Sequence, residues 1–110
     1  MTILEVETRE QDRTVHLSLR GELDLSTVEK VEQELRRAER SEPSLVILDL
    51  ASLSFLDSTG LRTIVTAHQR AQEAGHRLAI VKGPETVHRV FTITRLDERL
   101  DMVDDATELA

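Results

Sequence analysis

The first part of the chain alternates apolar and polar residues in two short stretches, which predicts two β-strands. These strands span about residues 2–8 and the region around residues 15–19. Only a short polar turn, residues 9–13, separates them, so we expect them to pair as antiparallel neighbours. The next segment, Gly21–Leu25, is predicted to be a loop.

Three later stretches carry apolar residues at the three- and four-residue spacing of amphipathic helices. They span about residues 27–40, about residues 58–74, and a shorter stretch that Gly83-Pro84 opens. The predicted buried stripes are Val28, Val31, Leu35 and Ala38 in the first helix, Leu61, Ile64, Val65, His68 and Ala71 in the second, and Val87, Val90 and Phe91 in the third, with Ile93 as a further candidate.

Residues that start and stop helices stand at the ends of these stretches. Ser26 and Glu29 have the spacing of a capping box, in which each side chain satisfies a backbone donor of the first turn. Ser41-Glu42-Pro43 ends the first helix, and Gly75 is a natural stop for the second. Pro84 stands near the first position of the third helix, where proline is favoured.

Two apolar stretches without helical spacing predict interior strands. Residues 45–50 are nearly all apolar, as in a strand covered on both faces, and residues 77–81 form a similar run. A short last strand is predicted over residues 100–103 and a last helical turn over residues 104–109. Strands separated by helices imply parallel pairing through right-handed crossovers. We therefore predict a single α/β domain spanning residues 1–110, with one core.

Composition narrows the function classes. The 14 basic and 21 acidic residues give a formal net charge of −7, without a basic run, so we expect no direct binding to nucleic acid or to an anionic membrane. The two aromatic residues, both Phe, are too few to form a platform on which the bases of single-stranded nucleic acid could stack. The absence of Cys excludes disulfides and thiolate metal sites. No apolar run reaches the length of a membrane span, which predicts a cytoplasmic protein.

The turn between the strand at 45–50 and the following helix carries the most informative chemistry. It reads Asp57-Ser58-Thr59-Gly60, and places the Ser58 hydroxyl at or beside the N-terminus of the helix. Unpaired backbone N–H groups and the positive end of the helix dipole lie there, ready for a phosphate. Ser58 is thus a candidate phosphorylation site. The alternative is a simple N-cap, with Asp57 or Thr59 sharing that task.

Signatures of catalysis and of metal binding are lacking. The sequence has no Gly-x-Ser-x-Gly elbow, Walker A sequence or dinucleotide glycine pattern, so we expect neither an enzyme nor a cofactor. His68 falls on an apolar stripe, where a lone histidine is usually a partly buried, hydrogen-bonded residue. The other three, His16, His76 and His88, lack metal-ligand spacing. The acidic residues of 97–105 lack the spacing of a calcium-binding loop.

Three segments in order resemble the STAS domain family and, within it, the bacterial anti-sigma-factor antagonists. Gly21-Glu22-Leu23-Asp24 is similar to the family signature after the second strand. Residues 45–61 resemble its central strand and phosphorylation turn, and residues 78–81 followed by 87–91 resemble the next strand and helix. The resemblance covers essentially the whole chain. It implies a STAS-like β/α superhelix with a mixed four- to five-stranded sheet and about four helices.

The resemblance also implies partner switching in transcription regulation. Unphosphorylated, such a protein binds an anti-sigma factor that is also a serine kinase, and so frees a sigma factor, for example in a stress response. The kinase then phosphorylates the serine that follows the aspartate, here Ser58, and the complex is lost. A serine phosphatase restores it. We expect a monomer, which is the simplest state for an acidic domain of this size.

The predicted partner-binding residues are Asp24, Asp57, Ser58, Thr59 and Gly60. Each has a structural alternative. Thr59 is the second candidate for phosphorylation, or else a helix residue with a local backbone bond. Gly60 admits a partner backbone, or simply starts the helix. Asp57 orients Ser58 or contacts the kinase, or is a favourable charge at a helix N-terminus. Asp24 joins the partner surface, or is a loop acid or secondary cap.

One position departs from the family pattern. Arg95 stands where the family often has a glycine, which would adopt a positive φ at little cost. A second functional hypothesis also stays open: a constitutive STAS module, as in a scaffold, lipid-transport or nucleotide-sensing component, in which Ser58 is never phosphorylated.

Overall fold

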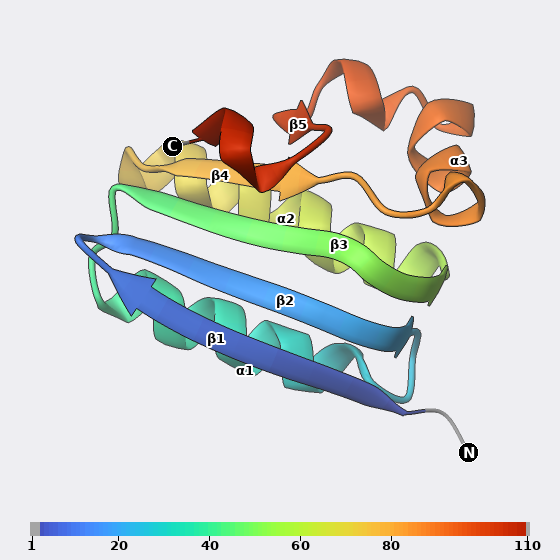
Figure 1. The fold of residues 1–110 in the computed structure, drawn as a ribbon, viewed down its shortest axis with the longest axis horizontal. Coiled ribbons are helices and arrows are strands. Elements are labelled where there is room, and N and C mark those ends of the chain that lie inside the picture. The colour runs from blue at the N-terminus through green and yellow to red at the C-terminus, as the bar shows by residue number, and fades with distance from the viewer. Residues whose placement is uncertain (1–2, 110) are drawn as a thin grey trace.

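A computed structural model describes residues 3–109 and shows a mixed five-stranded sheet with helices (Figure 1). The strands are β1 (Leu4–Gln11), β2 (Thr14–Leu23), β3 (Leu45–Leu56), β4 (Arg77–Val81) and β5 (Met102–Val103). The helices are α1 (Val28–Arg40), α2 (Ser58–Ala74), α3 (Glu85–Ile93) and two 3-10 helices, η1 (Leu96–Glu98) and η2 (Ala106–Leu109). Neighbours in the sheet follow chain order, β1 antiparallel to β2 and the others parallel, so the predicted α/β class is confirmed.

The helices divide the sheet into a covered and an open face. Figure 1 shows α1 and α2 against one face, and the main core fills the space between. This core is almost entirely aliphatic, with Phe91 as its one fully buried aromatic residue among those described. On the opposite face, η2 covers a smaller apolar cluster of Ile47, Val81 and Val103. None of the described helices is long and apolar enough to cross a membrane.

The first two strands are longer than the alternation of apolar residues predicts. β1 pairs with β2 from Leu4 opposite Gly21 to Gln11 opposite Thr14. The predicted turn over residues 9–13 therefore shrinks to Asp12 and Arg13, which both have positive φ, as in two-residue turns of type I′. The predicted loop over Gly21–Leu25 is wrong up to Leu23, because the backbone ladder continues there through polar residues.

The central strand β3 continues to Leu56, well past the predicted end at residue 50. Two register shifts against β2 show that β3 carries extra residues, as in β-bulges. From the first shift onward the buried positions, Leu50, Leu53 and Leu56, are three residues apart instead of two. Because of this spacing, burial after position 50 does not alternate from one residue to the next, as it does in a regular strand. The spacing also turns Phe55 outward, with 46% of its surface exposed.

The ends of the helices match the prediction in part. The second helix is observed over residues 58–74, and Gly75 ends it in the left-handed conformation (φ 82°) with its N–H bonded to the Ala71 carbonyl. The prediction of a capping box at Ser26 and Glu29 is wrong. The N-cap of α1 is Thr27, which makes no side-chain cap bond because its hydroxyl donates to the Glu22 carbonyl at 2.8 Å. The Ser26 hydroxyl donates to the Asp24 carboxylate at 2.7 Å and does not cap the helix either.

The C-terminal part differs more from expectation. Ile93 is 74% exposed and does not belong to the buried stripe of α3, whereas Val87 and Phe91 do. Arg95 itself adopts the left-handed conformation (φ 61°) where glycine is typical. The last strand is limited to Met102–Val103. The expected fourth helical turn is the 3-10 helix η2, so three α-helices are present among the described residues.

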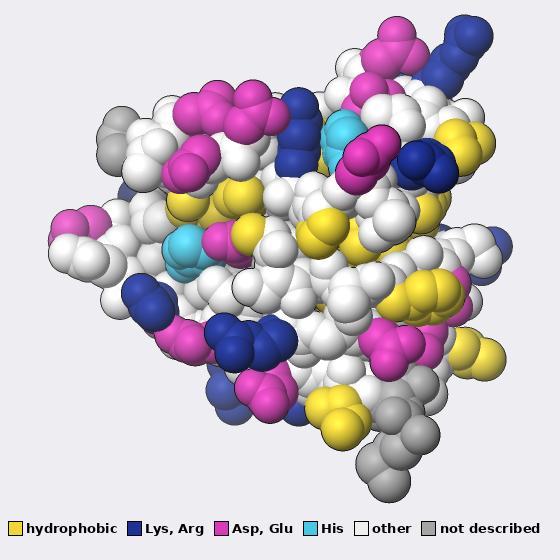
Figure 2. All heavy atoms as spheres, turned by 45° about the vertical axis from the view of Figure 1, so that its right-hand side comes forward, with side chains coloured by type: hydrophobic (Ala, Val, Ile, Leu, Met, Phe, Trp, Pro, Cys, Tyr) yellow, Lys and Arg dark blue, Asp and Glu magenta, His cyan; other side chains and the backbone are white. Residues whose placement is uncertain are grey.

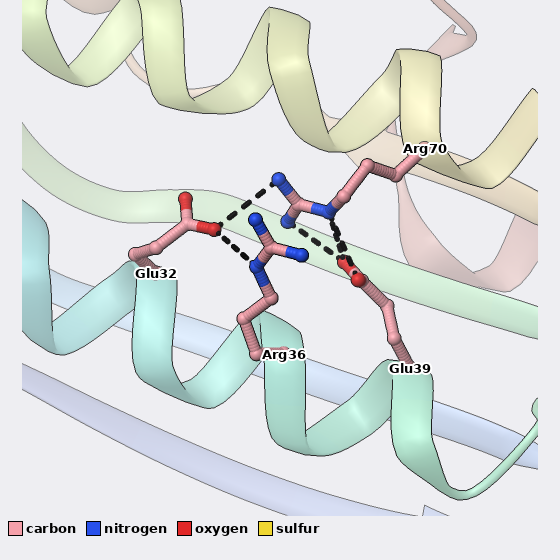
Figure 3. Close-up of polar contacts among 4 residues, drawn as sticks. All are labelled: Glu32, Arg36, Glu39 and Arg70. Carbon is pink, nitrogen blue, oxygen red and sulfur yellow. Dashed lines mark hydrogen bonds and ion pairs between the residues drawn. The ribbon is translucent and has the colours of Figure 1, made fainter.

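One arginine joins α2 to α1 (Figure 3). Arg70 Nε lies 2.9 Å from Glu39 Oε1 and its Nη2 lies 2.8 Å from Glu39 Oε2, a bidentate pair. Arg70 Nη1 lies 3.2 Å from Glu32, which also pairs with Arg36 at 2.9 Å. The hydrogen bond to Glu39 raises the pKa of Arg70, although partial burial opposes this. The contact helps to fix α2, whose N-terminus carries the candidate site.

Candidate functional site

Two segments meet at the end of the sheet where the parallel strands β2 and β3 finish. The loop between β2 and α1 and the turn between β3 and α2 both lie there, at the right-hand end of Figure 1. The Asp57 backbone N–H donates to the Leu23 carbonyl at 3.2 Å and ties the two segments together. Ligands of open α/β sheets commonly bind at this end, outside the carboxyl ends of the strands.

Asp57 is the N-cap of α2. Its backbone is extended (φ −106°, ψ −177°) and its Oδ1 accepts a hydrogen bond from the Gly60 N–H at 3.0 Å. The Leu61 N–H donates to the Asp57 carbonyl at 3.0 Å. Ser58 is therefore the first helical residue and is exposed. The alternative in which Ser58 is the N-cap is wrong, because Asp57 occupies that position.

The next two positions differ in accessibility. Thr59 is half-buried, and Gly60 is buried. A Cβ at position 60 would lie 2.7 Å from Leu23 Cγ and 2.7 Å from Leu56 Cδ1, too close for ordinary packing. Internal packing of α2 onto the ends of β2 and β3 thus requires the glycine. A partner contact at this position stays a prediction.

Asp24 organises the loop before α1. Its carboxylate accepts hydrogen bonds from the Ser26 N–H at 2.9 Å and from the Ser26 hydroxyl at 2.7 Å. The Thr27 hydroxyl donates to the Glu22 carbonyl at 2.8 Å and accepts from the Asp24 N–H at 3.0 Å. Thr27 is buried and holds the loop closed, a role that the sequence pattern does not reveal.

Two exposed apolar side chains border this end, and neither is among the site residues that the sequence predicts. Leu25 is 76% exposed, and with Phe55 and Asp57 it lines an open, mostly apolar hollow. Figure 2 brings this end of the molecule forward and shows hydrophobic side chains among acidic ones on its right-hand side. Two signals point to these residues: a leucine in a polar loop, and a phenylalanine beside serine near the end of β3.

His16, His68 and the acidic tail lie elsewhere. His16 Nε2 lies 3.0 Å from Asp49 on the open face, and His68 lines a crevice beside η1. No group of three or more His, Cys, Asp or Glu among residues 3–109 is placed to hold a metal ion. The acidic tail forms ion pairs, such as Lys82 with Asp104 at 2.9 Å. A backbone hydrogen bond from Thr107 lowers the pKa of Asp105.

Fold and site together define a small α/β domain whose distinctive surface is an exposed serine at a helix N-terminus beside apolar side chains. The model of the STAS domain matches residues 5–109. The chain therefore belongs to the STAS domain family, as its three motifs predict.

Relatives and solved structures agree with this assignment. The chain is 29% identical over 106 residues to an anti-sigma-B factor antagonist of Staphylococcus aureus, covering 96% of this chain and 97% of that protein. An anti-sigma factor antagonist from Mycobacterium paratuberculosis has the same fold, with a TM-score of 0.87, 20% identity, and coverage of 96% of this chain and 90% of that one.

SpoIIAA, an anti-sigma factor antagonist solved in its unphosphorylated form, matches with a TM-score of 0.80, 22% identity, and coverage of 96% and 93%. The phosphorylated form of the Bacillus cell fate determinant SpoIIAA matches with a TM-score of 0.73, 21% identity, and coverage of 96% of both chains.

Proposed function

We propose that this protein is an anti-sigma factor antagonist controlled by phosphorylation of Ser58. Membership of the STAS family and the names of the full-length staphylococcal relatives support the first part. The observation that carries the second is the place of Ser58: it is exposed, at the first position of α2, with Asp57 acting as the cap. Its side chain is thus not needed to hold the turn.

The local electrostatics fit a switch that acts at the binding surface. The N–H groups of Gly60 and Leu61 are already bonded to Asp57, which leaves those of Ser58 and Thr59 as donors of the first turn near a phosphate. The phosphate also adds a charge of about −1.5 to −2 beside the Asp57 carboxylate. The added bulk, and the repulsion between the phosphate and the Asp57 carboxylate, work against a partner that fits closely around the turn.

A modest effect on the complex is enough for control. A loss of ~3 kcal/mol weakens binding by roughly a hundredfold. Ser58 is the better acceptor than Thr59, because its side chain is exposed and that of Thr59 is half-buried.

The partners follow from this proposal. They are an anti-sigma factor with serine kinase activity and a serine phosphatase, met by this protein as a monomer in the cytoplasm. The protein itself is a binding module without catalytic turnover, and it needs no cofactor.

Intact-mass and fragment analysis of the protein from its own cells tests the proposal, in growth and under stress. We expect phosphate on Ser58 with an occupancy that changes between conditions, absent in Ser58→Ala and retained in the control Thr59→Ala. A protein without phosphate in every condition contradicts the phosphorylation switch and favours a constitutive STAS module.

A further inference from the structure

Large hydrophobic side chains are exposed at four described positions, and three of these positions share one end of the sheet. They are Ile3 (61% exposed), Leu25 (76%) and Phe55 (46%); the fourth, Ile93, lies on α3. Single exposed hydrophobic residues are ordinary, but a group at one place marks an interaction site.

Sheet pairing places two of the three in one row. The Glu22 N–H donates to the Ile3 carbonyl at 3.0 Å, next to the pair of Leu4 and Gly21. On the other side, Glu22 pairs with Phe55 of β3. Ile3, Glu22 and Phe55 therefore stand side by side across the three strands.

This row lies on the open face of the sheet. The residues that follow its three members, Leu4, Leu23 and Leu56, are all buried in the core beneath the helices. Successive side chains of a strand point to opposite faces, so Ile3, Glu22 and Phe55 point away from the helices. The row ends at the hollow that Leu25 and Asp57 line, one residue from Ser58.

Carboxylates separate the apolar side chains. Glu22 stands between Ile3 and Phe55, while Asp24 and Asp57 line the hollow with Leu25 and Phe55. Arg20 lies on the same face, farther from this end. The surface around Ser58 thus consists of apolar side chains bordered by carboxylates. A complementary partner must present apolar side chains bordered by basic ones.

We propose that Ile3, Leu25 and Phe55, framed by Glu22, Asp24 and Asp57, form one contact face for the anti-sigma factor. The partner presents an apolar recess bordered by lysine or arginine side chains. This inference rests on the proposed function and extends the partner surface from the turn at Ser58 across three strands to β1. Phe55 and Leu25 anchor the complex, while the carboxylates guide association with the basic side chains of the partner.

Titration of the purified anti-sigma factors of the source organism against the unphosphorylated protein tests this. We expect Phe55→Ser and Leu25→Ser each to raise Kd by about tenfold or more through faster dissociation, as for central apolar anchors. The matched control Ile93→Ser removes a similarly exposed side chain from α3 and should leave Kd within about twofold of wild type. Glu22→Gln should slow association and reduce its dependence on salt.

The outcomes separate this inference from the proposed function. Wild-type Kd values in both Phe55→Ser and Leu25→Ser, with Ser58→Glu abolishing binding, would overturn the contact face and leave the proposed function intact. Wild-type protein that binds none of the anti-sigma factors would overturn both. Because the substituted side chains are exposed, thermal unfolding of the variants should match wild type and so exclude misfolding as the cause.

Discussion

The Asp57 carboxylate accepts a hydrogen bond from the Gly60 N–H at 3.0 Å and thereby caps α2. The neighbouring Ser58 is left exposed at the first helical position. Two adjacent residues thus have separate tasks: one holds the helix end, and the other offers a hydroxyl to solvent. The separation matters because a residue that carries a phosphate should not also be required for the fold.

This division of tasks predicts the stability of variants at the turn. Asp57→Ala should lower the free energy of unfolding by about 1 kcal/mol, because the cap bond is lost. Asp57→Asn should lower it much less, since asparagine is an equally good cap. Ser58→Ala should change it by less than about 0.5 kcal/mol. Urea denaturation measures all three, and a larger loss in Ser58→Ala than in Asp57→Ala would contradict the assignment of the cap.

Gly60→Ala should destabilise the protein through overpacking. The new Cβ would lie 2.7 Å from Leu23 Cγ and from Leu56 Cδ1, and such strain costs about 1–3 kcal/mol. A double-mutant cycle with Leu23→Ala supplies the control, because truncating Leu23 makes room for the added methyl group. The double variant should lose less stability than the sum of the single variants. Strict additivity would show that the glycine is required for another reason.

Arg70→Met should loosen the contact between α1 and α2. The variant keeps the apolar stem but leaves Glu39 without its bidentate partner, at a cost of about 1–2 kcal/mol for this partly buried pair. Arg36→Met is the matched control: it also pairs with Glu32 but is far more exposed, so it should cost under about 0.5 kcal/mol. Equal losses for the two variants in chemical denaturation would refute a special role for Arg70.

Arg95→Gly should stabilise the protein. Arg95 has a φ of 61°, a conformation that costs a non-glycine residue roughly 1–2 kcal/mol, and part of this is offset by the greater chain entropy of glycine. The expected gain is about 0.5–1 kcal/mol, seen as a higher denaturation midpoint. Arg99→Gly, at a φ of −109°, should instead be destabilising. A loss of stability in Arg95→Gly would mean that the Arg95 side chain contributes more than the strain costs.

Local patterns predict the parts of this fold in which one chemical signal acts alone. The helix at 58–74 follows from its apolar stripe together with Gly75, whose left-handed backbone no other residue adopts so cheaply. The parallel strands follow from apolar runs alternating with helices. The position of Ser58 at a helix N-terminus follows in the same way, from the boundary between two kinds of periodicity.

Prediction from local sequence patterns fails where a contact with a distant or competing residue determines the structure. Ser26 has the spacing of a cap, but the Asp24 carboxylate takes its hydroxyl. The register shifts in β3 are set by its pairing with β2, so the apolar run predicts an end at residue 50 and does not predict that Phe55 belongs to the strand. Ile93 has a helical spacing from the core residues, yet α3 ends before any neighbour covers it. The proposed apolar contact face cannot be predicted from local sequence patterns for the same reason. Its residues Ile3 and Phe55 are far apart in the sequence, and sheet pairing brings them into one row.

The most direct test of the central claim measures the Kd of one anti-sigma factor for two forms of this protein. One form is unphosphorylated, and the other carries phosphoserine at position 58, introduced during translation. The account predicts tight binding by the unphosphorylated form and by Ser58→Ala, and a Kd at least about a hundredfold higher for the phosphorylated form. Equal affinities for the two forms would contradict it.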